Sequence, residues 1–138
     1  YGNFVLRLKW KLAGTGFVNA GIQFRSERLR DPAHEMTGYQ ADLGDKYWGA
    51  LYDESRRNRV LATPDQAAMP ARIKADDWND YEIRAEGRRI RLTLNGTQTV
   101  DYTEADAAIP LSGFIGLQIH GGGKALVSYK DLTIVELP

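Results

Sequence analysis

Polar side chains recur at two-residue spacing within one glycine- and aromatic-rich stretch of the sequence, residues 38–54. In an extended strand, residues two apart point to the same face. Gln40 and Asp42 would therefore share a face, and Tyr52 and Glu54 would share one on the strand after the next turn. A carboxyl group held between strands has its pKa raised by burial, which suits a general base. We take Asp42 as the candidate base. The candidate ligand-binding residues of this stretch are Gln40, Tyr52 and Glu54.

Two further segments show the same pairing of polar residues. Gln23 and Arg25 alternate with apolar positions, and so do Gln118 and His120. We expect the three strands to be neighbours that form one concave polar face, because polar groups converge in this way at ligand sites. Arg25 and His120 then become candidate catalytic residues, and the two glutamines candidate ligand-binding residues. The alternative is an ordinary solvated sheet face, on which Asp42 would pair with an arginine.

Aromatic and basic residues extend the candidate site. Trp48 and Tyr52 have flat side chains that stack on sugar rings, and Trp78 is a third such residue, for which core packing is an equally good interpretation. Arg56 follows a strand end, where loops commonly carry function. A calcium or magnesium site would need Asp42 or Glu54, but their spacing does not support one. No cofactor is therefore predicted.

The sequence pattern predicts that the elements that position these residues are β-strands. Apolar and polar residues alternate over nine or ten short segments separated by turn signals, and no helix is evident. Phe4, Leu6, Leu8 and Trp10 begin the predicted core face, and Leu117 and Ile119 belong to it near the other end. This pattern predicts an all-β sandwich, jelly roll or barrel.

Turn signals divide the segments. The run Ala13 to Gly16 is expected to be a turn, and Asn95-Gly96 predicts a type I′ hairpin turn. Residues 125–129 and 132–137 are expected to be separate strands. Residues 54–74 are expected to be a long loop with one helical turn at 65–68, and loops of this length are often functional.

Composition narrows the class of partner. The chain has 138 residues, the size of one domain, and its 18 Lys and Arg balance 18 Asp and Glu. Nucleic acids and anionic membranes normally require a basic excess, so a glycoside or oligosaccharide fits better. No apolar run is long enough to cross a membrane. The absence of cysteine excludes disulfides and thiolate metal sites, and two histidines alone do not support structural zinc.

Seven short motifs, in order along nearly the whole chain, resemble those of the 3-keto-disaccharide hydrolase domain family. They are residues 1–10, 19–25, 38–40, 49–52, 77–81, 94–96 and 113–120. The resemblance implies a concanavalin-like jelly roll of two antiparallel sheets in a single domain over residues 1–138. Members usually carry a further Gly- and Trp-containing segment before this start, which implies that a first strand or hairpin is lacking here. The resemblance also favours a periplasmic or extracellular location.

The resemblance further implies action on 3-keto-glycosides, sugars already oxidised at C3. The carbonyl acidifies the C2 proton, so that a base can form an enolate and the C1 oxygen leaves by β-elimination before water adds. On this interpretation Asp42 is the base and His120 the acid. Arg25 and Gln118 would bind the enolate oxygen. Many members carry an acidic residue where this chain has Gln40, which removes one candidate base.

Two rival functions come from similar folds. Jelly-roll β-glucanases carry Glu-x-Asp-x-x-Glu on the catalytic strand. The matching run of this chain has Gln40 in place of the first glutamate. Glutamine cannot be a carboxylate nucleophile, so retaining hydrolysis is excluded. The non-enzymatic alternative is a carbohydrate-binding or laminin-G-like module that uses Trp48, Tyr52 and the glutamines for recognition without turnover. Fold alone does not decide between binding and catalysis.

Overall fold

The computed structural model describes residues 1–138 and contains ten β-strands in two antiparallel sheets. The first sheet comprises β1 (Phe4–Gly16), β6 (Asn79–Glu86), β7 (Arg89–Leu94), β8 (Thr97–Thr103) and β10 (Gly123–Glu136). The second comprises β2 (Asn19–Arg28), β3 (Met36–Gly44), β4 (Leu51–Glu54), β5 (Val60–Ala62) and β9 (Phe114–Ile119). One 3₁₀ turn, η1 (Pro70–Arg72), is the only helical element, and no helix has the length and apolar character needed to cross a bilayer.

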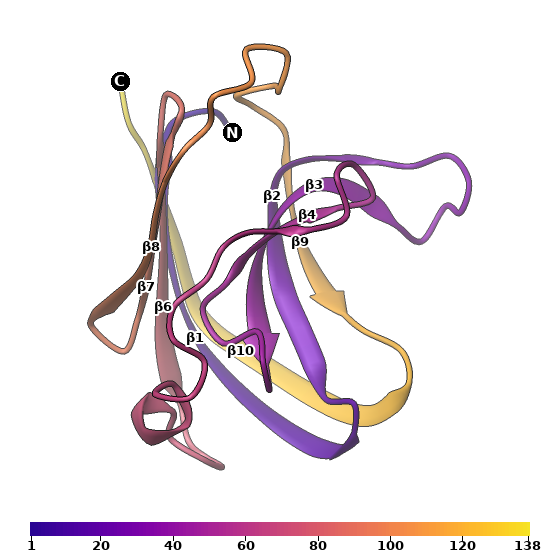
Figure 1. Cartoon of the computed structure of the whole chain (residues 1–138), viewed down its shortest axis with the longest axis vertical. Helices are drawn as coiled ribbons and strands as arrows, with labels where there is room; N and C mark the ends of the chain where they lie inside the picture. Colours follow the sequence, from indigo (N-terminus) through magenta and orange to yellow (C-terminus); the bar gives the residue numbers. More distant parts are fainter.

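The two sheets lie face to face (Figure 1). Their strand orders are β10-β1-β6-β7-β8 and β5-β4-β3-β2-β9, so most sequence neighbours pair but β1 and β2 belong to opposite sheets. This arrangement confirms the predicted two-sheet antiparallel jelly roll.

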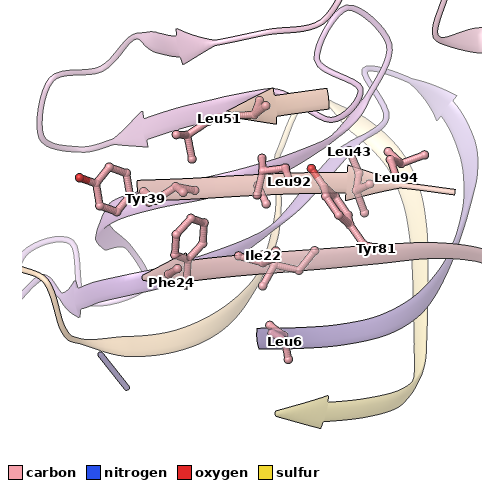
Figure 2. Close-up of a cluster of buried hydrophobic side chains, with 14 of the residues drawn as sticks. Leu6, Ile22, Phe24, Tyr39, Leu43, Leu51, Tyr81, Leu92 and Leu94 are labelled. Carbon is pink, nitrogen blue, oxygen red and sulfur yellow. The ribbon is translucent and has the colours of Figure 1, made fainter. Parts of the chain in front are cut away.

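The core lies between the sheets because alternate residues of each strand point inward. Phe4, Leu6, Leu8 and Trp10 of β1 are almost fully buried, as the alternation predicted. Side chains of the second sheet meet them from the other side, and Figure 2 shows part of this cluster. The opposite face of the second sheet is thereby left to its polar residues.

Glycines near the end of β1 allow close strand approach rather than a turn. The expected turn at residues 13–16 is wrong, because β1 continues to Gly16 and pairs with β10 as far as Gly123. A Cβ atom on Gly14 would lie 2.0 Å from the Lys124 carbonyl oxygen, so only glycine fits there. The chain reverses at residues 17–18 instead.

Two other expectations differ from the structure at the C-terminal end. Residues 125–137 do not form two strands, because β10 is continuous and absorbs an irregularity in its pairing opposite Leu8. Leu117 and Ile119 are not core residues: 55% and 53% of their surfaces are exposed. β9 is an edge strand that pairs only with β2, so its inward side is incompletely covered.

The segment between β4 and β6 is more regular than expected. It contains the short strand β5 at the edge of the second sheet and the 3₁₀ turn η1. Residues 65–68 form an isolated turn closed by one backbone hydrogen bond rather than a helix. This segment therefore extends the second sheet.

Candidate functional site

Strand register gathers the predicted polar residues of β2, β3, β4 and β9 on the outer face of the second sheet. Residues directly opposite in neighbouring antiparallel strands project to the same side. Two rows of side chains result: Gln23, Gln40 and Tyr52 in one, and Gln118, Gly21 and Asp42 in the other. The strands that the sequence marked as neighbours thus lie side by side.

A pocket of about 140 Å³ opens on this face. Its lining consists of Phe17, Asn19, Gln40, Asp42, Tyr47, Tyr52, Glu54 and His120. No lysine or arginine is among them, so the pocket suits a neutral polar ligand better than an anionic one. No group of three or more acidic, histidine or cysteine side chains in the molecule is arranged to hold a metal ion.

Asp42 is the buried carboxyl group of this pocket. Asp42 is only 3% exposed, and Gln40 Nε2 donates a hydrogen bond to the Asp42 Oδ1 atom at 2.5 Å. Burial raises the pKa of Asp42 to about 7; the negative charge of Glu54 acts in the same direction, and the Gln40 hydrogen bond opposes them. A carboxyl group with this pKa exchanges protons near neutral pH, which is the property of a general base.

Gln40 reaches Asp42 because Gly21 leaves room on β2. A Cβ atom at Gly21 would lie 2.9 Å from Gln40 Cγ and 3.1 Å from its Nε2 atom, so any side chain there would displace the glutamine. The Gln40 Oε1 atom is buried without a hydrogen-bond partner. An unpartnered buried acceptor is costly, so a ligand hydroxyl that donates to it would be stabilised.

His120 follows β9 and is held from two sides. Its backbone N–H donates to the Asn19 carbonyl oxygen at 2.9 Å, and its ring meets Phe17 edge-on at a centroid distance of 4.9 Å. Its Nδ1 atom lies 2.6 Å from the Gly121 carbonyl oxygen. Because a carbonyl only accepts, Nδ1 carries the hydrogen. The Nε2 atom is then the one that can exchange a proton with a ligand.

A second and larger pocket, of about 540 Å³, adjoins the first. The two pockets share Glu54 and His120, which therefore stand at the boundary between them. Gln23 and Gln118 lie in the second pocket, and the Gln118 Oε1 atom is buried without a partner. The remaining lining residues are His34, Glu35, Met36, Leu117, Ile119 and Gly121.

Arg25 does not lie in either pocket, which corrects its predicted place on the polar face. The pairing of β2 shifts register around Arg25, whose φ angle is 45°, so the strict alternation of sides is lost there. Its guanidinium donates to the backbone oxygens of Gly2 and Gly87, at 2.9 Å and 2.6 Å, and to Asn3 Oδ1. Arg25 therefore links the second sheet to the first.

Arg56 is also outside the pockets. Its Nη2 atom lies 2.6 Å from Asp53 Oδ1, and its guanidinium covers the Tyr39 ring at 4.8 Å from the centroid. Asp53 and Tyr39 are opposite each other on the core side of β4 and β3, so this arginine closes one end of the core.

The two tryptophan candidates lie away from the first pocket. Trp48 stacks on Trp10 of the core at a centroid distance of 5.7 Å. Trp78 is half-buried, with the Nζ atoms of Lys11 and Lys130 at 4.9 Å and 4.3 Å from its ring centroid. Of the predicted aromatic residues, only Tyr52 lines the pocket.

Three pocket residues were not predicted: Phe17, Asn19 and Tyr47. Asn19 could have been found by the same alternation. It lies two and four residues before Gly21 and Gln23, so its side chain points to the polar face. Phe17 and Tyr47 come from turns, where alternation gives no direction for a side chain.

Comparison with protein families gives one match over nearly the whole chain. The family described as 3-keto-alpha-glucoside-1,2-lyase-like domain matches residues 1–135 of the chain. No match was found among curated proteins.

Solved structures share the fold at low sequence identity. A provisionally named glycosyl hydrolase from Parabacteroides distasonis has a TM-score of 0.68 at 23% identity, over 99% of this chain and 79% of that one. A carbohydrate-binding module from Bacillus subtilis has a TM-score of 0.64 at 18% identity, over 97% of this chain and 75% of that one. The alginate lyase A1-II′ has a TM-score of 0.58 at 16% identity, over 99% and 63% of the two chains.

Proposed function

The chain belongs to the 3-keto-alpha-glucoside-1,2-lyase-like domain family, and on this premise we propose that it cleaves 3-keto-glycosides by β-elimination. The observation that carries this proposal is the buried carboxyl group of Asp42, whose pKa is raised to about 7 in a pocket without lysine or arginine. A carbohydrate-related fold alone would not distinguish this reaction from sugar binding.

The reaction begins with proton abstraction at C2. Asp42 takes the proton, which the C3 carbonyl acidifies, and the electron pair forms an enolate between C2 and C3. The enolate then collapses: the carbonyl re-forms, a double bond forms between C1 and C2, and the bond from C1 to the glycosidic oxygen breaks. His120, in its imidazolium form, donates the Nε2 proton to that oxygen and becomes neutral imidazole with the hydrogen on Nδ1, releasing an alcohol. Addition of water across the new double bond makes the net result hydrolysis.

The enolate oxygen needs hydrogen-bond donors, and the first pocket offers two. Burial raises the pKa of the Tyr52 hydroxyl, and the charge of Glu54 adds to this shift, so the group stays protonated and able to donate. The Asn19 side-chain amide lines the same pocket. We assign the enolate oxygen to these two residues. Arg25 donates to the Gly87 carbonyl oxygen outside the pocket, and Gln118 lies in the neighbouring pocket.

The absence of lysine and arginine from both pockets favours an uncharged sugar over a uronate. A carboxylate-bearing sugar placed beside Asp42 and Glu54 would meet like charge without a compensating cation. A neutral glycoside instead offers hydroxyl donors to the two carboxyl groups and to the unpartnered oxygen of Gln40.

Sugar binding without turnover is the weaker candidate. That function was expected to use Trp48, Tyr52 and the glutamines for recognition, with the two aromatic residues as the pair that would stack on a sugar. Trp48 packs on Trp10 instead, which leaves Tyr52 as the one candidate from that pair in the pocket. A buried carboxyl group that titrates near neutral pH has an obvious use in proton transfer and none in stacking a sugar.

The test is to incubate the protein with ethyl 3-keto-α-glucoside in D₂O and follow ethanol release and C2 deuteration by NMR. We expect both to occur, and ethyl α-glucoside, which lacks the carbonyl, to remain intact. Asp42→Asn should slow release by about 10²- to 10⁴-fold. A protein that neither exchanges C2 nor releases ethanol would refute the proposal.

A further inference from the structure

We propose that a third pocket, of about 430 Å³, binds a neutral glucose unit of an oligosaccharide. The pocket shares Phe17 with the first pocket, so the two adjoin, but neither Asp42 nor His120 lines it. The site is therefore separate from the proposed reaction centre, and the inference does not depend on the elimination reaction.

The pocket exists because glycines take the place of larger residues at the end of β1. Leu12, Gly14 and Gly16 continue the inward-facing row of Trp10, and all three line the pocket. Beyond Leu12 this row has no side chain to fill the space between the sheets. The sequence of β1 thus leaves room for a ligand next to the end of the core.

The size and composition of the pocket are those of a small-molecule site. Pockets that hold such ligands measure about 300–1,000 Å³ and are lined mainly by apolar and aromatic side chains with a few polar groups. Six of the eleven lining residues are hydrophobic, against three of eight in the first pocket. The third pocket therefore suits a ligand with an apolar face better than the first pocket does.

Trp48 gives this pocket a rigid aromatic surface. The Trp48 ring stacks on Trp10, yet the residue is only half-buried, and it lines the pocket. The Gln66 side chain holds its backbone from both sides: the Trp48 N–H donates to Gln66 Oε1, and Gln66 Nε2 donates to the Trp48 carbonyl oxygen, each at 2.9 Å. An aromatic ring that is fixed before binding loses little conformational entropy when a ligand packs against it.

The polar residues of the pocket favour a neutral ligand with several hydroxyl groups. Asp45, Lys46 and Asp76 are exposed, and none of them takes part in an ion pair within the molecule. Carboxylates accept hydrogen bonds from hydroxyl groups, and an ammonium group donates to them. A strongly charged ligand would meet like charge as well as opposite charge here. Glucopyranose carries equatorial hydroxyls at its edge and C–H groups on its faces, so it matches the free polar groups and the aromatic surface together.

The experiment follows the indole N–H signals of ¹⁵N-labelled protein by NMR while cellotriose or maltotriose is added. The chain has three tryptophans, and the Trp48 signal is the one that Trp48→Phe removes. We expect this signal to shift saturably with a dissociation constant of about 1–10 mM, because one sugar face buries little area. Trp78 does not line the pocket, so its signal should stay in place.

Asp76→Gly tests the polar contacts. Asp76 has a φ angle of 52°, which glycine adopts without strain, so the variant removes the carboxylate and keeps the turn. The dissociation constant should rise at least about fivefold. Asp131→Gly is the matched control, because Asp131 is also exposed, has a φ angle of 53° and lies outside the pocket. This variant should bind the sugars as the wild type does.

Three results would overturn the proposal. The first is a Trp48 signal that stays in place with either sugar at about 100 mM. The second is a shift that Glu54→Gln abolishes, because Glu54 lines the first and second pockets but not the third. The third is tighter binding of 2-phenylethanol than of either sugar, which would identify a site for apolar rings. Ethanol release from ethyl 3-keto-α-glucoside tests the elimination reaction separately, so either proposal can fail without the other.

Discussion

Asp42 and Gln40 form a hydrogen-bonded pair in which Gln40 influences the pKa of Asp42. Burial removes water from the Asp42 carboxyl group and raises its pKa, while the single hydrogen bond from Gln40 keeps the shift moderate and orients the carboxyl group. Glu54 contributes negative charge from the next strand. A carboxyl group that is half-ionised near neutral pH is present in the proton-accepting form and is also more basic than an ordinary carboxylate.

The rate of elimination should rise between about pH 5 and pH 7, because only the ionised form of Asp42 can accept the C2 proton. The measurement is kcat/KM for ethyl 3-keto-α-glucoside between pH 5 and pH 9. Gln40→Leu should move the rise to higher pH, since it removes the hydrogen bond that favours the charged form. A rise that persists unchanged in Asp42→Asn would assign it to another group.

Asp42 should also lower the stability of the protein at neutral and alkaline pH. Its pKa is about 7 in the folded state against an ordinary value of 3.8, so folded protein retains a proton that unfolded chain releases. Stability therefore falls between about pH 4 and pH 7 relative to a variant that cannot ionise. Asp42→Asn should be more stable than the wild type by up to about 4 kcal/mol at pH 8, with little difference at pH 3.

Urea unfolding at the two pH values measures this effect. An equal difference between wild type and Asp42→Asn at pH 3 and pH 8 would show that the carboxyl group is not the cause.

At the scale of elements, a buried ion network fixes the turn after β4 to the chain after β8. Arg57 bonds to Asp53, and its Nη2 atom lies 2.7 Å from Glu104 Oε2, which also accepts a hydrogen bond from the Tyr39 hydroxyl at 2.6 Å. Burial alone would raise the pKa of Glu104, but the bonds from Arg57 and Tyr39 outweigh it and hold that pKa at about 2. The network thereby holds β4, which carries two pocket residues, Tyr52 and Glu54.

Arg57→Ala should destabilise the fold by about 3–5 kcal/mol at pH 7, because it leaves the buried carboxylate of Glu104 without its cation, whereas Asp53 keeps its ion pair with Arg56. Glu104 contributes stability above about pH 4.5 and loses it as the pH falls toward 2, so the effect should shrink in acid. Arg59→Ala is the matched control, an exposed arginine of the same turn, and should change stability by less than about 0.5 kcal/mol. Equal losses in the two variants on denaturant unfolding would contradict the role of the network.

At the scale of the molecule, the sheet order leaves β9 and β10 as free edges of opposite sheets. β10 exposes Leu126 and Val135, at 67% and 52% of their surfaces. An edge strand with unpaired backbone groups and apolar side chains can pair with another chain.

The chain should therefore self-associate as its concentration rises, through the β10 edge. Leu126→Lys should weaken this association, because a charged edge residue opposes pairing. Val60→Lys, on the edge strand β5 of the other sheet, is the matched control and should not weaken it. Analytical ultracentrifugation over a hundredfold concentration range would measure the effect, and a wild type that stays monomeric throughout would contradict it.

Much of the fold and part of the site could be predicted from alternation alone. Phe4, Leu6 and Trp10 were placed in the core, and Gln40 and Asp42 on one polar face, because side-chain direction in a strand follows from local backbone geometry. The Asn95-Gly96 hairpin turn followed from local chemistry too, and both residues have positive φ angles, as a type I′ turn requires.

The sequence by itself thus determined which side chains alternate, where one tight turn lies and that the chain forms β-sheets. Only the tertiary structure decided that Arg25 leaves the polar face at an irregularity in β2, and that Leu117 and Ile119 are exposed at a sheet edge instead of buried in the core. The burial that raises the pKa of Asp42 was likewise decided by the tertiary structure. Register, edge position and desolvation depend on contacts between residues far apart in the chain, whereas a two-residue period reports only on neighbours.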